Sequence, residues 1–143
     1  MGGRNFSRKS QIGVEYMIVV GFVTFAILSV LTLAYFYSDQ IKESIRLNQI
    51  ESFATQLVRS AEGVFFSGEP SRTTVRLYLP DGVESIQIVS DAVIITTNTG
   101  KGNKNIRVFE SKVLMQPGSI TPSEGIKKLT LTALAGEVSI IQG

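Results

Sequence analysis

The sequence predicts an α+β protein, with one long N-terminal helix followed by a small antiparallel β-sandwich or sheet. Three patterns support this prediction: an uncharged apolar run at residues 16–38, helical periodicity that continues to residue 66, and strand-like alternation from residue 73 onward. The 143 residues have room for about one ordinary domain. The chain has no cysteine and no histidine, which excludes disulfides, thiolate nucleophiles and an imidazole base. We therefore expect no enzyme, no metal site and no cofactor.

The apolar run at residues 16–38 predicts a transmembrane segment. It contains 23 residues, of which 18 are apolar and none is charged. A bilayer core needs about 20 helical residues at roughly 1.5 Å each, so the run is long enough to cross with some tilt. The alternative is a buried core helix of a soluble domain, but such helices rarely stay uncharged over this length.

The charges on either side of this segment predict its orientation. Residues 1–10, the leader, carry three basic residues and no acidic one, whereas Asp39 and Glu43 lie just beyond the apolar run. The positive side of a span stays inside, so we expect a cytoplasmic N-terminus and an exported body. Of the 14 basic and 12 acidic residues, the leader holds three basic ones, so the remainder has 11 against 12. We therefore expect no nucleic-acid partner.

The helical pattern continues beyond the apolar run. From residue 39 to residue 66, apolar residues recur mostly every three or four positions, as in Ile41, Ile45, Ile50, Phe53, Leu57, Ala61 and Val64. No proline or glycine separates this amphipathic stretch from the span, so we expect one helix over residues 11–67. A cleaved secretory signal is the alternative. Its apolar region is typically about 7–15 residues long and ends in small residues, whereas this run ends in Tyr35, Phe36 and Tyr37.

Residues 68–143, the headpiece, are expected to form the β region. Glycine and proline at residues 67–71 end the helix, and strands are predicted at residues 73–79, 85–89, 92–97, 106–110, 127–134 and 137–141. Residues 113–115 either extend one of these strands or stand alone. The continuous apolar run at residues 92–97 suits a central strand. Turns are expected at Pro80-Asp81-Gly82 and at the hairpin Ala135-Gly136. Because this region is small, we expect the sheet to pack on the apolar stripe of the amphipathic helix.

Two charged groups in the headpiece have both a structural and a functional interpretation. Asp81, Glu84 and Asp91 could approach one another near a turn, but they do not follow an EF-hand pattern, and a solvated loop is favoured over calcium binding. A local basic patch surrounds the loop after residue 98: Lys101, Lys104, Arg107 and Lys112. Such a patch is usually a solvated face, although it could contact an acidic surface or another subunit.

The junction between the leader and the apolar run carries the most specific pattern. A basic pair, Arg8 and Lys9, precedes Ser10-Gln11, and a single carboxylate, Glu15, follows four residues after the glutamine. From physics alone, a glutamate at the edge of a membrane segment could simply reach back to the lipid headgroups. The arrangement as a whole resembles the class III signal peptide of archaeal type IV pilins.

The resemblance covers residues 8 to about 38 in motif and the whole chain in architecture. In that family, cleavage occurs before the glutamine of a glutamine, any, serine, any, glutamate pattern, and leucine follows four residues later. Gln11 and Glu15 match this pattern, while Gly13 stands where serine is usual and Val19 where leucine is usual.

The resemblance implies that a membrane prepilin peptidase cleaves between Ser10 and Gln11, with Arg8, Lys9, Gly13 and Glu15 directing processing and assembly. It further implies partners: copies of the chain itself, an assembly ATPase and a membrane platform protein. The subunit would be a single-pass membrane protein before assembly and part of an extracellular adhesion filament on the archaeal cell surface afterwards. Gly21, Ala26 and Ala34 would permit close packing between helices.

Two alternatives to a main structural subunit remain at this point. The first is a minor or accessory pilin, which would be made and cut in the same way. The second belongs to another class of protein: an uncleaved single-pass membrane anchor that displays an extracellular β binding domain. An N-terminus at Gln11 in protein from cells would exclude the anchor, whereas a retained leader would exclude both kinds of pilin.

Overall fold

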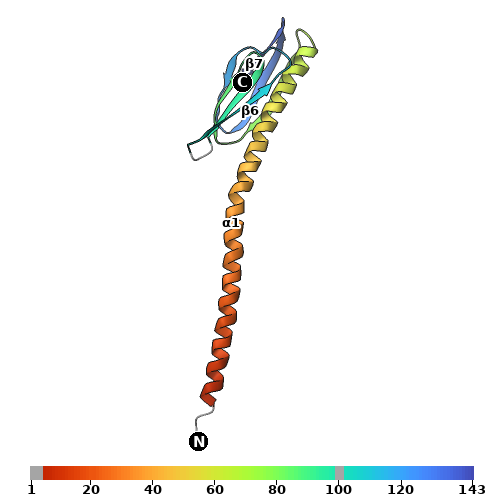
Figure 1. Cartoon of the computed structure of the whole chain (residues 1–143). Coiled ribbons are helices and arrows are strands. Elements are labelled where there is room, and N and C mark those ends of the chain that lie inside the picture. Colours follow the sequence, from red (N-terminus) through yellow and green to blue (C-terminus); the bar gives the residue numbers. More distant parts are fainter. Residues whose placement is uncertain (1–4, 99–101) are drawn as a thin grey trace. The chain divides into compact units, whose positions relative to one another are not determined.

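The computed structural model describes the backbone of residues 5–98 and 102–143, and the side chains within these ranges from residue 11 onward. The described elements are the helix α1 (Asn5–Phe66) and the strands β1 (Arg72–Leu79), β2 (Val83–Ile88), β3 (Ala92–Asn98), β4 (Lys104–Glu110), β5 (Gly118–Ile120), β6 (Gly125–Leu134) and β7 (Glu137–Gln142). Figure 1 shows the helix followed by the strands. The α+β prediction is confirmed.

The chain forms two compact units, and the division falls within α1. The N-terminal unit is Met1–Glu43 and the C-terminal unit is Ser44–Gly143. The described part of the N-terminal unit is helical throughout. The C-terminal unit combines the last part of α1 with all seven described strands. The amphipathic part of the helix therefore belongs to the same compact unit as the sheets.

The strands of the C-terminal unit form two antiparallel sheets. One sheet has the order β1-β6-β7 and the other has the order β4-β3-β2-β5. Strand β3 lies inside its sheet, paired with β2 on one side and β4 on the other, as its apolar run predicted. Strands β6 and β7 form the predicted hairpin, in which Leu134 pairs with Glu137 around Ala135-Gly136. The two antiparallel sheets agree with the prediction of a small β-sandwich or sheet, whereas the order of the strands was not predicted.

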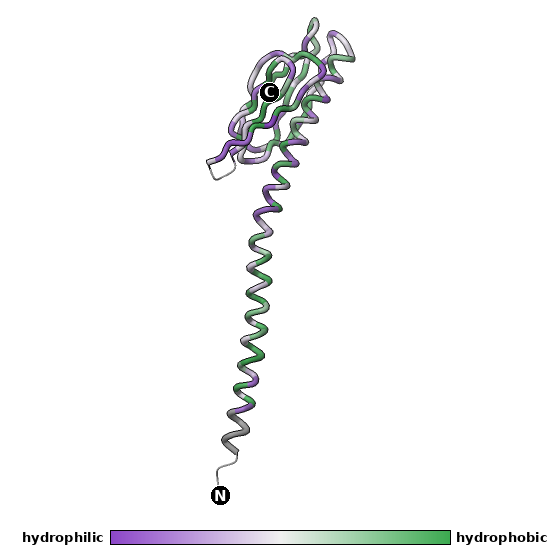
Figure 2. The backbone as a smooth tube through the Cα atoms, viewed as in Figure 1, coloured by the Kyte–Doolittle hydropathy of each residue, from purple (hydrophilic) through white to green (hydrophobic). Residues whose placement is uncertain are grey.

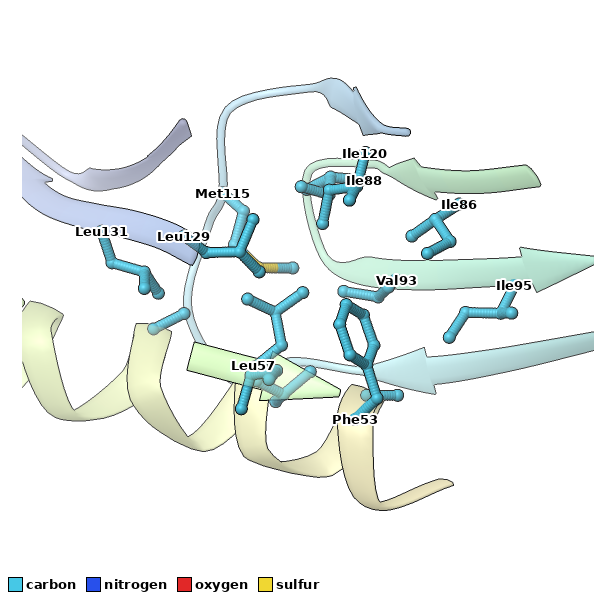
Figure 3. Packing of buried hydrophobic residues seen from close by; sticks show 14 of the residues in the cluster. Phe53, Leu57, Ile86, Ile88, Val93, Ile95, Met115, Ile120, Leu129 and Leu131 are labelled. Atoms are coloured by element: carbon cyan, nitrogen blue, oxygen red, sulfur yellow. The ribbon is translucent and has the colours of Figure 1, made fainter. Parts of the chain in front are cut away.

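The buried residues of both sheets and of the helix form one hydrophobic core. The helix contributes apolar side chains spaced mostly by three and four: Ile50, Phe53, Ala54, Leu57, Val58, Ala61 and Val64. Figure 3 shows Phe53 and Leu57 of the helix packed among side chains such as Val93 and Leu129 of the sheets and Met115 of the segment between β4 and β5. These five side chains are at most 1% exposed, so the expected packing of the sheet on the amphipathic stripe is confirmed.

The helix also makes polar contacts with the outer strands of both sheets. Arg46 Nε lies 3.5 Å from the carboxylate of Asp81, which directly follows β1 after Pro80. Arg107 Nη1 of β4 lies 3.8 Å from the carboxylate of Glu51. Strands β1 and β4 are edge strands of different sheets, so these ion pairs link the helix to the edge of each sheet.

Residues 111–120 differ from the prediction. Residues 113–115 form no regular strand; Met115 makes a single parallel bridge to Val138 of β7, with Val138 N–H donating to Leu114 O at 2.8 Å. The short strand β5 follows Pro117, where the sequence indicated only a break, and it pairs with β2. Both features depend on neighbours distant in the sequence, because neither segment is long enough to show a period of its own.

Candidate functional site

The apolar segment, residues 16–38, exposes hydrophobic side chains on all sides of the helix. The consecutive residues Met17, Ile18, Val19 and Val20 are 74%, 66%, 59% and 44% exposed. Successive residues of an α-helix are about 100° apart, so four in a row cover its whole circumference. Figure 2 shows the hydrophobic colour continuing through this part of α1. None of the described residues from 11 to 43 is buried.

Two hydroxyl groups within the apolar segment are bonded to their own helix. Ser29 Oγ donates to Phe25 O at 2.8 Å, and Thr32 Oγ1 donates to Leu28 O at the same distance. A hydroxyl satisfied in this way can enter an apolar environment without losing a hydrogen bond to water. The helix is long and apolar enough to cross a membrane. Unlike a core helix, its most apolar stretch is not buried against the rest of the chain.

The leader junction lies on the same helix. Gln11 and Glu15 are exposed and lie one helical turn apart, with Gly13 between them. Glu15 is the only charged residue between Lys9 and Asp39. The backbone of the implied cleavage position, between residue 10 and Gln11, is helical. The side chains of Arg8, Lys9 and Ser10 lie outside the described residues.

Two of the three acidic residues considered for calcium, Asp81 and Glu84, have separate cationic neighbours. The carboxylate of Asp81 pairs with Arg46, and Glu84 Oε1 accepts a hydrogen bond from Lys104 Nζ at 2.6 Å. Among the described residues, no group of three acidic side chains could hold a metal ion. The ion pairs of Asp81 and Glu84 are consistent with the solvated-loop interpretation.

The local basic patch is divided among several acidic partners. Lys104 pairs with Glu84, and Arg107 pairs with Glu51 of the helix. The backbone N–H of Lys112 donates to Glu62 Oε1 at 3.1 Å. Lys101 lies outside the described residues. The side chains of Lys104 and Arg107 thus attach β4 to other elements, whereas Lys112 makes its contact through the backbone.

One tyrosine of the headpiece has a perturbed ionisation. Tyr78 donates its phenolic hydrogen to Glu124 Oε1 at 3.1 Å. This hydrogen bond raises the pKa of Tyr78 above its ordinary value, with smaller contributions from desolvation and from the charges of Glu124 and Asp81. The side chain is 45% exposed, and among the described hydrogen bonds no further side chain joins the Tyr78–Glu124 pair. The pair thus has no evident catalytic use.

None of the candidate residues that the sequence suggested lies on the outer face of the β1-β6-β7 sheet. That face brings Arg76 of β1 directly opposite Lys128 of β6. The two residues are 52 positions apart, so only the strand register reveals that they are neighbours. Strand alternation does predict that each of them points away from its buried neighbours, Leu77 and Leu129.

Comparison with known proteins yields no match. No family model, no curated protein and no solved structure is matched by this chain. A functional assignment therefore rests on the residues of the chain itself: the apolar segment, its junction with the leader and the faces of the C-terminal unit.

Proposed function

We propose that the chain is a structural subunit of an archaeal type IV pilus-like adhesion filament, processed by a prepilin peptidase and assembled through its N-terminal helix. The observation that most supports this proposal is the apolar segment. Its side chains are exposed around the whole helix, and an apolar surface of this extent needs either lipid or other apolar helices around it. A filament core made of copies of the same segment would supply such an environment.

Removal of the leader would make transfer from the membrane into a filament easier. The leader carries three positive charges, and a basic residue beside an anionic membrane surface contributes about 1 kcal/mol of attraction. Cleavage before Gln11 would thus remove roughly 3 kcal/mol of electrostatic anchoring. Because the backbone there is helical, a peptidase would have to unwind about one turn. Gly13 lowers that cost, since glycine disfavours a helix by about 1 kcal/mol relative to alanine.

Glu15 would have a second role in assembly. A carboxylate that enters an apolar core is costly unless it is paired or protonated. Cleavage would create an α-amino group at Gln11, and the resemblance to pilins suggests this group of a neighbouring copy as the partner of Glu15. Such a pair would also set the register between subunits, because only one axial offset brings the two charges together.

Gly21 would be a point of close approach between helices. A side chain at this position would meet nothing within 4 Å in the isolated chain, so the fold itself does not require a glycine here. Between two apolar helices, however, a glycine lets the backbones approach closely. Gly21→Leu should therefore leave the C-terminal unit folded and reduce filament formation.

The test combines electron microscopy of filaments sheared from cells with mass spectrometry of their N-termini. We expect this chain to be the dominant component and to begin at Gln11. Glu15→Gln should abolish or shorten the filaments, whereas Asp39→Asn, which removes one carboxylate beyond the apolar segment, should leave them intact.

Other outcomes of the same experiment would identify the alternatives. A processed chain that is scarce in the filaments would indicate a minor or accessory subunit. A chain that retains the leader and stays in the membrane fraction would exclude both kinds of pilin and favour an uncleaved anchor with an extracellular β binding domain. Normal filaments from Glu15→Gln would remove the proposed assembly role of Glu15.

A further inference from the structure

The outer face of the β1-β6-β7 sheet gathers basic and hydroxyl side chains in register. Three cross-strand rows are involved: Arg72 with Thr132 and Ser139, Thr74 with Thr130 and Ile141, and Arg76 with Lys128. No aspartate or glutamate belongs to these rows. We call this surface the basic sheet face. It belongs wholly to the C-terminal unit.

The three cations of this face lack acidic partners. Within residues 5–98 and 102–143, neither Arg72, Arg76 nor Lys128 forms an ion pair, and all three are exposed. By contrast, Arg46, Lys104 and Arg107 of the same unit each pair with a carboxylate.

The position of Arg76 opposite Lys128 is unfavourable in the isolated protein. Like charges directly across an antiparallel pair destabilise it, because their side chains start only about 5 Å apart. A bound anion would remove this repulsion and would meet two positive side chains at one point. The guanidinium group of Arg76 is further suited to a carboxylate or sulfate, since it can donate two parallel hydrogen bonds.

The geometry of the face indicates an extended ligand. Arg72 and Arg76 lie on the same side of β1 and are separated by four residues, or about 13 Å along the strand. Between them lie Thr74 and Thr130, whose hydroxyl oxygens are 3.2 Å apart and can both donate and accept hydrogen bonds. The ring of Tyr78, 45% exposed, continues the same column beyond Arg76. Its hydroxyl donates to Glu124 Oε1, so an acidic group marks the end of the face and an anionic group of the ligand would lie on the Arg76 side of this ring.

We infer that the basic sheet face binds an anionic polysaccharide, with its chain lying along the strands. Its carboxylates or sulfates would meet Arg72 at one end and the Arg76–Lys128 pair at the other. Sugar hydroxyls would bond to the threonines between these two points, and a sugar ring would stack on Tyr78. This inference does not depend on filament formation, because the face is complete within one subunit.

Binding of the full-length protein in a neutral detergent to immobilised polygalacturonate tests the inference. The face variant R72Q/R76Q/K128Q is compared with the matched variant K42Q/R59Q/K112Q, which removes three exposed positive charges elsewhere. We expect the face variant to bind at least about tenfold more weakly, because its charge complementarity is lost, and the matched variant to change less than about threefold. Wild-type binding should also weaken with salt.

Controls on the protein and on the ligand keep the result interpretable. Lys128→Arg preserves the charge and should preserve the affinity, and circular dichroism establishes that each variant is folded. Neutral dextran should not bind, and polyglutamate, which carries carboxylates without sugar rings, should bind more weakly than polygalacturonate. Equal losses in the two triple variants would overturn the assignment to this face. Equal binding of polyglutamate and polygalacturonate would overturn the assignment to a polysaccharide.

Discussion

Leu57 provides a direct test of the helix as part of the C-terminal core. Its side chain is fully buried, and it belongs to the same cluster as Val93 and Leu129 of the two sheets. Replacement of a fully buried leucine by alanine removes transfer free energy and leaves a cavity, which together cost about 3–4 kcal/mol. Leu57→Ala should lower the free energy of unfolding of the C-terminal unit by this amount.

The chain contains a matched control on the same helix. Leu31 lies in the apolar segment and is 59% exposed, so Leu31→Ala creates no cavity in the C-terminal unit. In detergent we expect this substitution to change the unfolding of that unit by less than about 0.5 kcal/mol.

Urea denaturation of the full-length protein, followed through the methyl resonances of Val93 and Leu129, measures both effects at the sheet core. For a unit of 100 residues and a urea dependence of about 1.5 kcal/mol per molar, Leu57→Ala should lower the midpoint by about 2 M. In a thermal scan, the same loss corresponds to a decrease of roughly 12–30 °C. A loss below about 1 kcal/mol, or equal losses in the two variants, would refute the assignment of the amphipathic helix to the core.

Three further predictions concern the C-terminal unit. Gly82 has a φ of +77°, and an added Cβ would lie 2.9 Å from Arg46 Nη1; Gly82→Ala should therefore destabilise the unit by about 1–2 kcal/mol in a urea titration. Gly63 lies in the helix with open space around it, so Gly63→Ala should raise the free energy of unfolding of the unit by about 0.5–1 kcal/mol. If Gly82→Ala and Gly63→Ala changed the free energy of unfolding in the same direction, this reasoning would be contradicted. The hydrogen bond to Glu124 raises the pKa of Tyr78 in the folded protein. The contribution of this hydrogen bond to stability is therefore complete below the ordinary tyrosine pKa of 10.0, and it is lost as the pH rises through the higher pKa of the folded state. Ultraviolet absorbance titration should show one tyrosine that ionises at lower pH in Glu124→Gln than in the unsubstituted chain, and identical curves would disprove the coupling.

The helix and most strands were predictable because their signals are local. The length of an uncharged run and the spacing of apolar residues by three and four depend only on nearby residues, and these patterns located both parts of α1. Alternation in β1 and β6 and the continuous apolar run in β3 located these strands within two residues of their observed bounds. The turn residues Gly82 and Gly136 were also recognisable, and both adopt the positive φ that favours glycine.

The short and irregular elements were not predictable. Strand β5 has only three residues and follows Pro117, so it carries no period and its composition indicates a break. The bridge between Met115 and Val138 depends on the edge of β7, which a sequence does not display. Lys127 also breaks the usual rule for charged residues: it is only 6% exposed, and its amine bonds to Ser123 Oγ at 2.5 Å.

The candidate sites also fall into two groups, one that is visible in the sequence and one that is visible only in the folded structure. The sequence by itself determined the leader, the apolar segment and the Gln11–Glu15 junction, since these are contiguous in the chain and defined by charge and length. Only the tertiary structure decided the basic sheet face, because Thr74 and Thr130, which lie 56 residues apart, become neighbours through strand register. Register is set by which side chains can be buried together across both sheets and the helix, and that is a property of the packed core and not of any one segment.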